Sequence, residues 1–350
     1  MTIDLSQRTC PLPHTNNDCF LLAHGEGAGL TRKFLDQYLR PLLDNRYLMQ
    51  RGDAAVLAQE DHLPVISTDS YVVSPLFFPG GDIGCLAVHG TVNDLAVTGA
   101  TPKYLTLSLM IEEGLPLATM ERVLQSVADS AQRCRVQVVA GDTKVVPRGH
   151  LDQLFINTTG IGYRPHAIDW GMPRIQPGDH VLLSGTMGDH GLAILAAREQ
   201  LHFAKPIKSD TTPLHELVNA LQKHHSAIHC MRDPTRGGVA AVLHEMVEGT
   251  GFSIRIYENQ LPIRPDVRGA CEILGLNPIY IANEGKAIVV VAPEAADSVL
   301  STMREHPLGR DAARIGIIES KRPPLVWIEG LMGIARVLDE PSGAPLPRIC

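Results

Sequence analysis

The sequence lacks the features that mark several common kinds of protein. It has no CxxC pair, no apolar stretch long enough to cross a bilayer and no long run of charge of one sign. Its first residues, MTIDLSQRTC, have neither the basic nor the apolar region of a signal peptide. We therefore expect a cytoplasmic protein with no membrane partner.

The seven cysteines do not form a recognisable metal or disulfide pattern. Their number is odd and their spacing is not that of a zinc ribbon, which disfavours both a zinc site and a disulfide framework. Most of them are expected to be small buried hydrophobes. Cys350 differs from the others because no residue follows it.

The length and composition predict a globular protein with more than one core. A chain of 350 residues exceeds the usual size of a single-core domain, and 44% apolar residues can fill two cores. The formal net charge of −7 has no basic patch beside it, which disfavours a nucleic-acid partner.

Strand patterns alternate with helix patterns along the chain, which predicts an α/β or α+β fold. In the first half, strands are expected at 54–57, 65–68, 105–111, 136–140 and 155–163, and helices at 30–49, 86–98 and 117–134. In the second half, strands are expected at 180–184, 253–257 and 287–292, and helices at 190–200, 212–224 and 237–249.

Composition shifts suggest where the domains begin and end. The expected parts are a disordered extension (1–20), an N-terminal domain (21–164), a linker (165–178), a C-terminal α/β domain (179–339) and a flexible tail (340–350). The tail reads EPSGAPLPRIC, and its prolines and glycine predict an extended, mobile arm.

A glycine-rich stretch, HGEGAG at 24–29, precedes the first predicted helix. Gly25, Gly27 and Gly29 would let the backbone approach a phosphate at a helix N-terminus. An ordinary turn is an equally good interpretation, and no GxxxxGK[ST] loop occurs.

Several aspartates lie at predicted strand ends or beside small residues. Carboxylate oxygens are the ligands that Mg²⁺ prefers, and Mg²⁺ usually arrives with nucleotide phosphates. A helix cap or a turn is the plainer interpretation of each aspartate taken alone. The candidates are Asp53, Asp69, Asp94, Asp142 and Asp233, the last in a DPTRGG segment where Arg236 could also face an anion.

Cys350 at the end of the arm is a candidate movable nucleophile, since the thiolate is the reactive form and exposure favours it. The alternative is an incidental exposed thiol. Prenylation is disfavoured because the modified cysteine of a CaaX box is fourth from the end.

Together these segments resemble the HypE family of hydrogenase maturation factors, relatives of aminoimidazole ribonucleotide synthetase and selenophosphate synthetase. The resemblance runs from about His24 to Cys350. Its most specific elements are STDSYVVSPLFFPGGDIG, HGTVNDLAVTGATP, AGDTKVV, DPTRGGVA, NEGK and the closing PRIC. One departure is HGEGAG, where the family more often has a run of glycines.

The resemblance implies a two-domain fold like that of aminoimidazole ribonucleotide synthetase, with mixed sheets and a homodimer formed by paired N-terminal sheets. It also implies that a partner carbamoyltransferase loads a carboxamide onto Cys350. The enzyme would then use ATP and Mg²⁺ to dehydrate this group to a thiocyanate. The product would supply cyanide to an iron-carrying maturation scaffold complex for a [NiFe] hydrogenase.

The resemblance also assigns roles to particular residues. Asp53, Asp94 and Asp233 would bind Mg²⁺, and Asp69, Asp142, Arg236 and the three glycines would bind the ATP phosphates. Cys350 would be the acceptor. Three residues are candidates for the proton-abstracting base: Lys144, which should share a strand face with Asp142; Glu284, which could pair with such a lysine; and His89.

Two other functions stay open. The chain could be a superfamily relative that acts on a soluble small molecule, such as a kinase or an amide-forming synthetase. It could instead be a nucleotide-binding scaffold that presents its tail to partners without catalysis.

Overall fold

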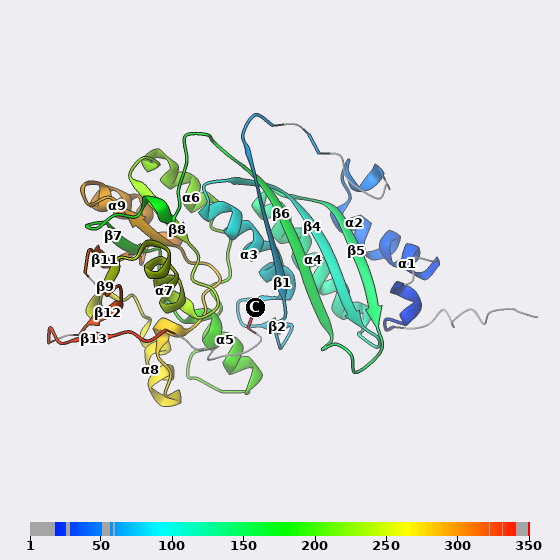
Figure 1. The fold of residues 1–350 in the computed structure, drawn as a ribbon. Coiled ribbons are helices and arrows are strands. Elements are labelled where there is room, and N and C mark those ends of the chain that lie inside the picture. Colours follow the sequence, from blue (N-terminus) through cyan, green and yellow to red (C-terminus); the bar gives the residue numbers. More distant parts are fainter. Residues whose placement is uncertain are drawn as a thin grey trace, which may run out of the picture.

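The computed structural model describes residues 18–25, 29–50, 57–58, 60–321, 323–330, 332–340 and 349–350. Two sheets, each covered by helices, account for most of this part of the chain (Figure 1). The α/β fold with mixed sheets is therefore confirmed. The expected strand at 54–57, most of the N-terminal extension and tail residues 341–348 lie outside the described residues.

The N-terminal sheet has four strands in the order β1-β6-β4-β5, with β4 and β5 parallel and the other pairs antiparallel. Its strands are β1 (Leu63–Tyr71), β4 (Thr101–Glu112), β5 (Gln137–Val146) and β6 (Leu154–Arg164). A small hairpin of β2 (Phe77–Phe78) and β3 (Gly81–Asp82) precedes the first long helix. These four strands match the predicted ones apart from their ends.

One face of this sheet is covered by α3 (Ile83–Val97) and α4 (Leu117–Cys134) (Figure 1). Alternation explains why: in β6, Leu154 and Ile156 are fully buried, whereas the intervening Phe155 is half-buried on the other face. That other face also carries Ile66 of β1, which is 70% exposed. The sheet therefore has a face that the described part of the chain leaves largely uncovered.

Helix α3 lies between the two halves of the molecule. Its first turn is capped by Asp82, whose carboxylate accepts from the amides of Gly84 (2.7 Å) and Cys85 (3.1 Å). Nearly all of its side chains are buried, because it packs against β1 and β6 on one side and against α6 and β8 on the other. Polar residues on α3 are therefore placed between the two halves.

The C-terminal sheet has seven strands in the order β13-β12-β9-β11-β7-β10-β8, of which only the β9–β12 pair is parallel. They are β7 (His180–Leu183), β8 (Ile228–Arg232), β9 (Ser253–Tyr257), β10 (Ile288–Val291), β11 (Ala313–Glu319), β12 (Val326–Glu329) and β13 (Ala335–Val337). The helices of this half are α5 (Asp189–Arg198), α6 (His215–Leu221), α7 (Gly238–Thr250), α8 (Pro265–Leu274) and α9 (Ala296–Glu305).

The two faces of this sheet pack against different helices. Leu182 of β7 lies in one core with α6 and α9, while its neighbours Val181 and Leu183 lie in another core with α7. Helices α5 and α8 instead contribute to the core of the N-terminal half. The two halves therefore share a continuous apolar interior.

The segment expected to be a linker, 165–178, is well packed. Ile168, Trp170 and Ile175 are each no more than 6% exposed, and the indole N–H of Trp170 donates to the carbonyl of His225 at 3.0 Å. Its prolines and glycines set the turns, but its apolar side chains anchor it to the C-terminal half. The predicted domain boundaries stay predictions.

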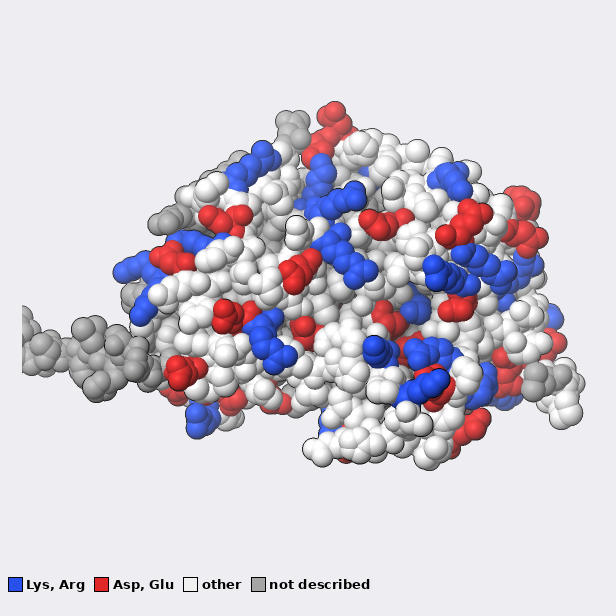
Figure 2. Space-filling view, turned by 180° about the vertical axis from the view of Figure 1, so that it is seen from behind, with Lys and Arg blue, Asp and Glu red and all other residues white. Residues whose placement is uncertain are grey.

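The N-terminal helical segment is broken into short pieces, α1 (Gly29–Phe34) and α2 (Arg40–Leu43), joined by a π-helical turn. No helix within the described ranges is both long and apolar enough to span a bilayer. On the molecular face shown in Figure 2, basic and acidic side chains are interspersed.

Candidate active site

A cavity of about 190 Å³ lies where the two halves meet, and we call it the acid pocket. Its residues come from β1, α3, the loop before α7, the NEGK turn (283–286) and the C-terminal end. Figure 1 shows the C-terminal end in the middle of the molecule. Its lining residues are Asp69, Ser70, Tyr71, Gly90, Asp94, Arg232, Asp233, Thr235, Arg236, Glu284 and Cys350. Four carboxyl groups and one thiol thus face a single small space.

The aspartates of the acid pocket are crowded together. Asp69 points from β1 toward α3 and accepts from the hydroxyl of Tyr71 at 3.2 Å. Asp94 on α3 accepts from the hydroxyl of Ser67 at 2.5 Å. Burial and the nearby Asp233 raise the pKa of Asp94 to about 8, and burial raises the pKa of Asp233 to about 6. The acids of the cluster therefore hold their protons more strongly than ordinary carboxyl groups, although Arg232 and Arg236 also line the pocket.

Such a donor set fits a divalent cation that brings other ligands with it. Within the described ranges, no group of three or more His, Cys, Asp or Glu side chains could hold a metal by itself. Mg²⁺ in phosphate-binding sites usually takes only one or two carboxylates, and water and phosphate complete its shell. One or two of Asp69, Asp94 and Asp233 could take part in such a shell, because a cation would stabilise their ionised forms.

Glu284 lies at the bottom of the acid pocket and is 3% exposed. Its backbone amide donates to Asp210 at 3.1 Å, and its carbonyl accepts from Asn93 at 3.3 Å. One carboxyl oxygen, Oε1, is buried without a hydrogen-bond partner among the described residues. Burial, followed by repulsion from Asp233, raises the pKa of Glu284 well above its ordinary value.

Cys350 and Glu284 line the same small pocket, and the thiol and the carboxyl group interact there. The preceding Ile349 is 4% exposed in the core of the N-terminal half. Burial and then Glu284 raise the pKa of the Cys350 thiol well above its ordinary value, whereas Arg236 acts in the opposite direction. The expectation of an exposed thiol that readily ionises is therefore wrong for this docked position.

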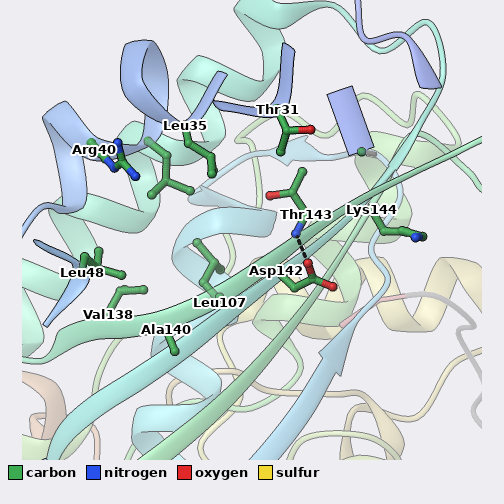
Figure 3. Close-up of a pocket in the computed structure, with 13 residues that line it drawn as sticks. Thr31, Leu35, Arg40, Leu48, Leu107, Val138, Ala140, Asp142, Thr143 and Lys144 are labelled. Carbon is green, nitrogen blue, oxygen red and sulfur yellow. Dashed lines mark hydrogen bonds between the residues drawn. The ribbon is translucent and has the colours of Figure 1, made fainter. Parts of the chain in front are cut away.

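A second cavity, of about 290 Å³, lies over β5 and beneath the N-terminal helices, and we call it the strand-edge pocket (Figure 3). Its apolar side chains come mainly from these helices and from β4 and β5. Asp142, Thr143 and Lys144 of β5 lie together, whereas Arg40 lies on the other side of the pocket. The lining residues are Gly25, Thr31, Leu35, Leu39, Arg40, Leu48, Leu107, Val138, Ala140, Gly141, Asp142, Thr143 and Lys144.

Two features of the strand-edge pocket concern Gly25 and the polar residues of β5. A Cβ on Gly25 would lie 2.4 Å from the amide nitrogen of Val145, so only glycine fits there. Asp142 accepts from the amide of Thr143 at 2.8 Å, and both Asp142 and Lys144 are exposed (Figure 3). Their alternate positions on β5 agree with the predicted common face.

The predicted site residues thus fall into two groups. Asp69, Asp94, Asp233, Arg236, Glu284 and Cys350 line the acid pocket, while Gly25, Asp142 and Lys144 line the strand-edge pocket. Gly29 is the first residue of α1, and Gly27 and Asp53 lie outside the described residues. Asp69 of the first group lies on β1, and Asp142 and Lys144 of the second lie on β5. These two strands are the opposite edges of the four-stranded sheet.

Two expectations about the proton-abstracting base are not met. Glu284 does not pair with Lys144, because the two line different pockets. His89 does not line the acid pocket: its Nδ1 lies 3.4 Å from the hydroxyl of Thr211, and burial lowers its pKa to about 3. Three residues that contact the site were missed: Tyr71, His190 and Asp210. Tyr71 lies in the STDSYVVSPLFFPGGDIG segment but was given no role, whereas His190 and Asp210 stand in no recognisable motif.

Comparison with known proteins shows which family the chain belongs to. Residues 51–163 match the family model described as AIR synthase related protein, N-terminal domain, and residues 176–327 match its C-terminal domain. Carbamoyl dehydratase HypE of Escherichia coli is 45% identical over 334 residues, which cover 94% of this chain and 98% of that protein. The chain belongs to the HypE family.

Solved structures of HypE proteins share the fold of this family member. A hydrogenase maturation protein HypE crystallised in complex with ATP matches with a TM-score of 0.91 and 43% identity, over 94% of this chain and 99% of that one. HypE in a HypE–HypF complex matches with a TM-score of 0.78 and 44% identity, over 90% of this chain and 100% of that one.

The raised pKa of Asp94 predicts how the stability of this HypE family member depends on pH. The folded state keeps a proton on Asp94 up to pH 8, whereas the unfolded chain loses it near pH 4, so rising pH favours unfolding across that range. Asp94→Asn should remove this penalty. Its advantage in unfolding free energy should grow from pH 5 to pH 8, by at most about 1.4 kcal/mol per pH unit.

Urea unfolding at pH 5 and pH 8 measures this effect, with the exposed Asp311→Asn as the matched control. Addition of Mg²⁺ and ATP at pH 8 should stabilise the wild type more than Asp94→Asn. An Asp94→Asn chain that is no more stable than the wild type at pH 8 would contradict the crowding of acids.

Proposed function

We propose that this chain catalyses the ATP-dependent dehydration of a carboxamide on Cys350 to a thiocyanate, which supplies cyanide for [NiFe] hydrogenase maturation. The observation that carries the proposal is the position of Cys350. Its thiol lies beside the buried Glu284 in a pocket whose aspartates suit a phosphate-bound cation. A substrate carried on Cys350 would be held in this pocket.

The chemistry balances with the groups present. The carboxamide oxygen attacks the γ-phosphorus of ATP, ADP leaves, and the carbon–oxygen bond then breaks to release phosphate. The nitrogen loses both of its protons, and the product is a thiocyanate, ADP and phosphate. The amide oxygen, a poor leaving group, departs as part of phosphate.

Glu284 is the group we propose as the base. A carboxylate that is buried beside other acids holds a proton more strongly than an ordinary one, and so can accept one of the two nitrogen protons. The departing phosphate takes the other. The free oxygen Oε1 is available for this contact. His89 is too weakly basic and lies outside the pocket, and Lys144 is better placed for a phosphate contact.

ATP binding is assigned to the strand-edge pocket. Its apolar lining suits a nucleotide base, and Gly25, Asp142 and Lys144 at its polar end suit phosphates. The HypE protein solved in complex with ATP supports ATP binding by a member of this family. Asp69, Asp94 and Asp233 would hold Mg²⁺, which neutralises phosphoryl charge when bound. The predicted roles of Asp53 and Gly27 stay predictions.

The proposed partners follow from the same chemistry. A carbamoyltransferase must load Cys350, which the solved HypE–HypF complex supports, and an iron-carrying scaffold complex must receive the cyanide. The reaction is proposed to take place in the cytoplasm.

A homodimer would bring the two groups of site residues together. In one chain they lie at opposite edges of the N-terminal sheet, and that sheet has a largely uncovered face with Ile66 on it. We propose that the sheets of two subunits pair, so that the strand-edge pocket of one serves the acid pocket of the other.

Mass spectrometry of the intact chain tests the central reaction. After incubation with the carbamoyl donor system, Cys350 should gain one carboxamide, and ATP should then cause the loss of one water. Cys350→Ser should show neither change, while Cys19→Ala, which removes another half-buried thiol, should show both.

The other functions give different results in this experiment. Turnover of ATP with a soluble substrate that survives Cys350→Ser would favour the small-molecule enzyme. A carboxamide-loaded chain whose mass stays constant with ATP would favour the scaffold and contradict the dehydratase.

Complementation tests the shared site. Asp142→Asn and Glu284→Gln should each be nearly inactive alone. The first disables the strand-edge pocket and the second disables the acid pocket. Co-expressed and mixed at random, they should regain about a quarter of wild-type activity, since half of the dimers would have one intact site.

The matched control mixes Asp142→Asn with Lys144→Met, two variants of the same pocket, and should regain nothing. Equal inactivity of both mixtures would contradict a site shared between subunits.

A further inference from the structure

His190 lies at the start of α5 and is fully buried, yet both of its ring nitrogens have partners. Nε2 lies 2.6 Å from the carbonyl oxygen of Ile349, and Nδ1 lies 2.8 Å from the hydroxyl of Ser209. A carbonyl only accepts, so Nε2 carries the proton and Nδ1 accepts from Ser209. The amide of Thr211 in turn donates to the oxygen of Ser209 at 3.0 Å, which orients its hydroxyl.

The imidazole is held in one orientation. The ring of Phe78 meets it edge to face, with centroids 5.7 Å apart. Burial lowers the pKa of His190, which favours the neutral tautomer just described. A buried donor is thus fixed toward the last peptide group of the chain.

That peptide group determines where Cys350 lies. The carbonyl of Ile349 belongs to the peptide bond that joins Ile349 to Cys350, and the Ile349 side chain is buried beside it. When the Ile349 carbonyl is held in place, only rotations about the bonds of Cys350 itself can move its thiol. The thiol then lies against Glu284.

Asp210, the residue after Ser209, binds the backbone of Glu284, the proposed base. Asp210 accepts from the amide of Glu284 at 3.1 Å and pairs with Lys286 at 2.9 Å, both within a buried environment. A Cβ on Gly285 would lie 2.0 Å from the carbonyl oxygen of Asp210, so the two backbones approach as closely as glycine allows. One short loop therefore contacts both the base and, through His190, the tail.

We propose that His190 is a positioning residue: with Ser209, it binds the Ile349 carbonyl and presents the group on Cys350 to Glu284. This inference rests on the proposed function, which gives the docked tail its purpose. His190 itself does not touch the reacting atoms.

Two substitutions of similar polarity separate positioning from general structural support. The amide nitrogen of a glutamine reaches as far as Nε2 of histidine, so His190→Gln keeps the donor to Ile349. An asparagine reaches only as far as Nδ1, so His190→Asn keeps the contact with Ser209 and loses the tail.

The first readout is the rate at which a small thiol reagent modifies Cys350 without ATP, followed by peptide mass spectrometry. Modification depends on how often the tail undocks. His190→Asn should be modified about tenfold faster than the wild type, because the carbonyl of Ile349 loses its hydrogen bond from His190. His190→Gln should stay near the wild-type rate. Ser209→Ala, which frees the tautomer, should show a smaller increase.

The second readout is the dehydration rate of the preloaded chain at saturating ATP, which should fall for His190→Asn and recover in His190→Gln. Equal modification rates for wild type and His190→Asn, or no change in Ser209→Ala, would overturn the positioning role. If the modification rates differ as expected but no chain loses water with ATP, positioning stands and the proposed function fails.

Discussion

The contact between Glu284 and the Cys350 thiol is the interaction on which the site depends. It places a buried carboxyl group, a free carboxyl oxygen and the end of the chain in one small cavity. Burying several carboxyl groups together disfavours their ionised forms, which raises the pKa of Asp94 and of Asp233. A cation brought with ATP would relieve it, so the pocket is suited to act only when its substrates are bound.

The fold explains how such a pocket can exist. Helix α3, buried on nearly every side, carries Asp94 between the halves, while β1 brings Asp69 and the loop before α7 brings Asp233. The NEGK turn is fixed from behind by Asp210 and Asn93. Each acidic group is thus held by a rigid element of a different part of the chain.

Much of the fold could be predicted from periodicity. Helix α4 and strand β9 begin and end at the predicted residues, because both have clear patterns bounded by Pro116, Arg135 or Gly251. The helices α8 and α9 were not predicted, although each has a regular apolar side. The strands β8, β11, β12 and β13 were not predicted, since short apolar segments become strands only through tertiary pairing. The packed segment around Trp170 was taken for a linker, because its apolar residues are buried only by tertiary packing.

The site could be predicted in composition but not in arrangement. Motif resemblance selected Asp69, Asp94, Asp233, Glu284 and Cys350, which do come together. It gave no sign that Asp142 and Lys144 lie in another pocket, because sheet order decides that and a single sequence does not reveal it. His190 and Asp210 act through contacts between distant segments, so no local pattern marks them.

The most direct test of the account is the pH dependence of a single turnover of the carboxamide-loaded chain, in the wild type and in Glu284→Gln. A base with a raised pKa must lose its proton first, so the wild-type rate should rise with pH well above the ordinary range of a carboxyl group and then level off. Glu284→Gln should be slower by about 100-fold or more and should lack this rise. A Glu284→Gln chain that dehydrates the carboxamide at the wild-type rate would contradict the account.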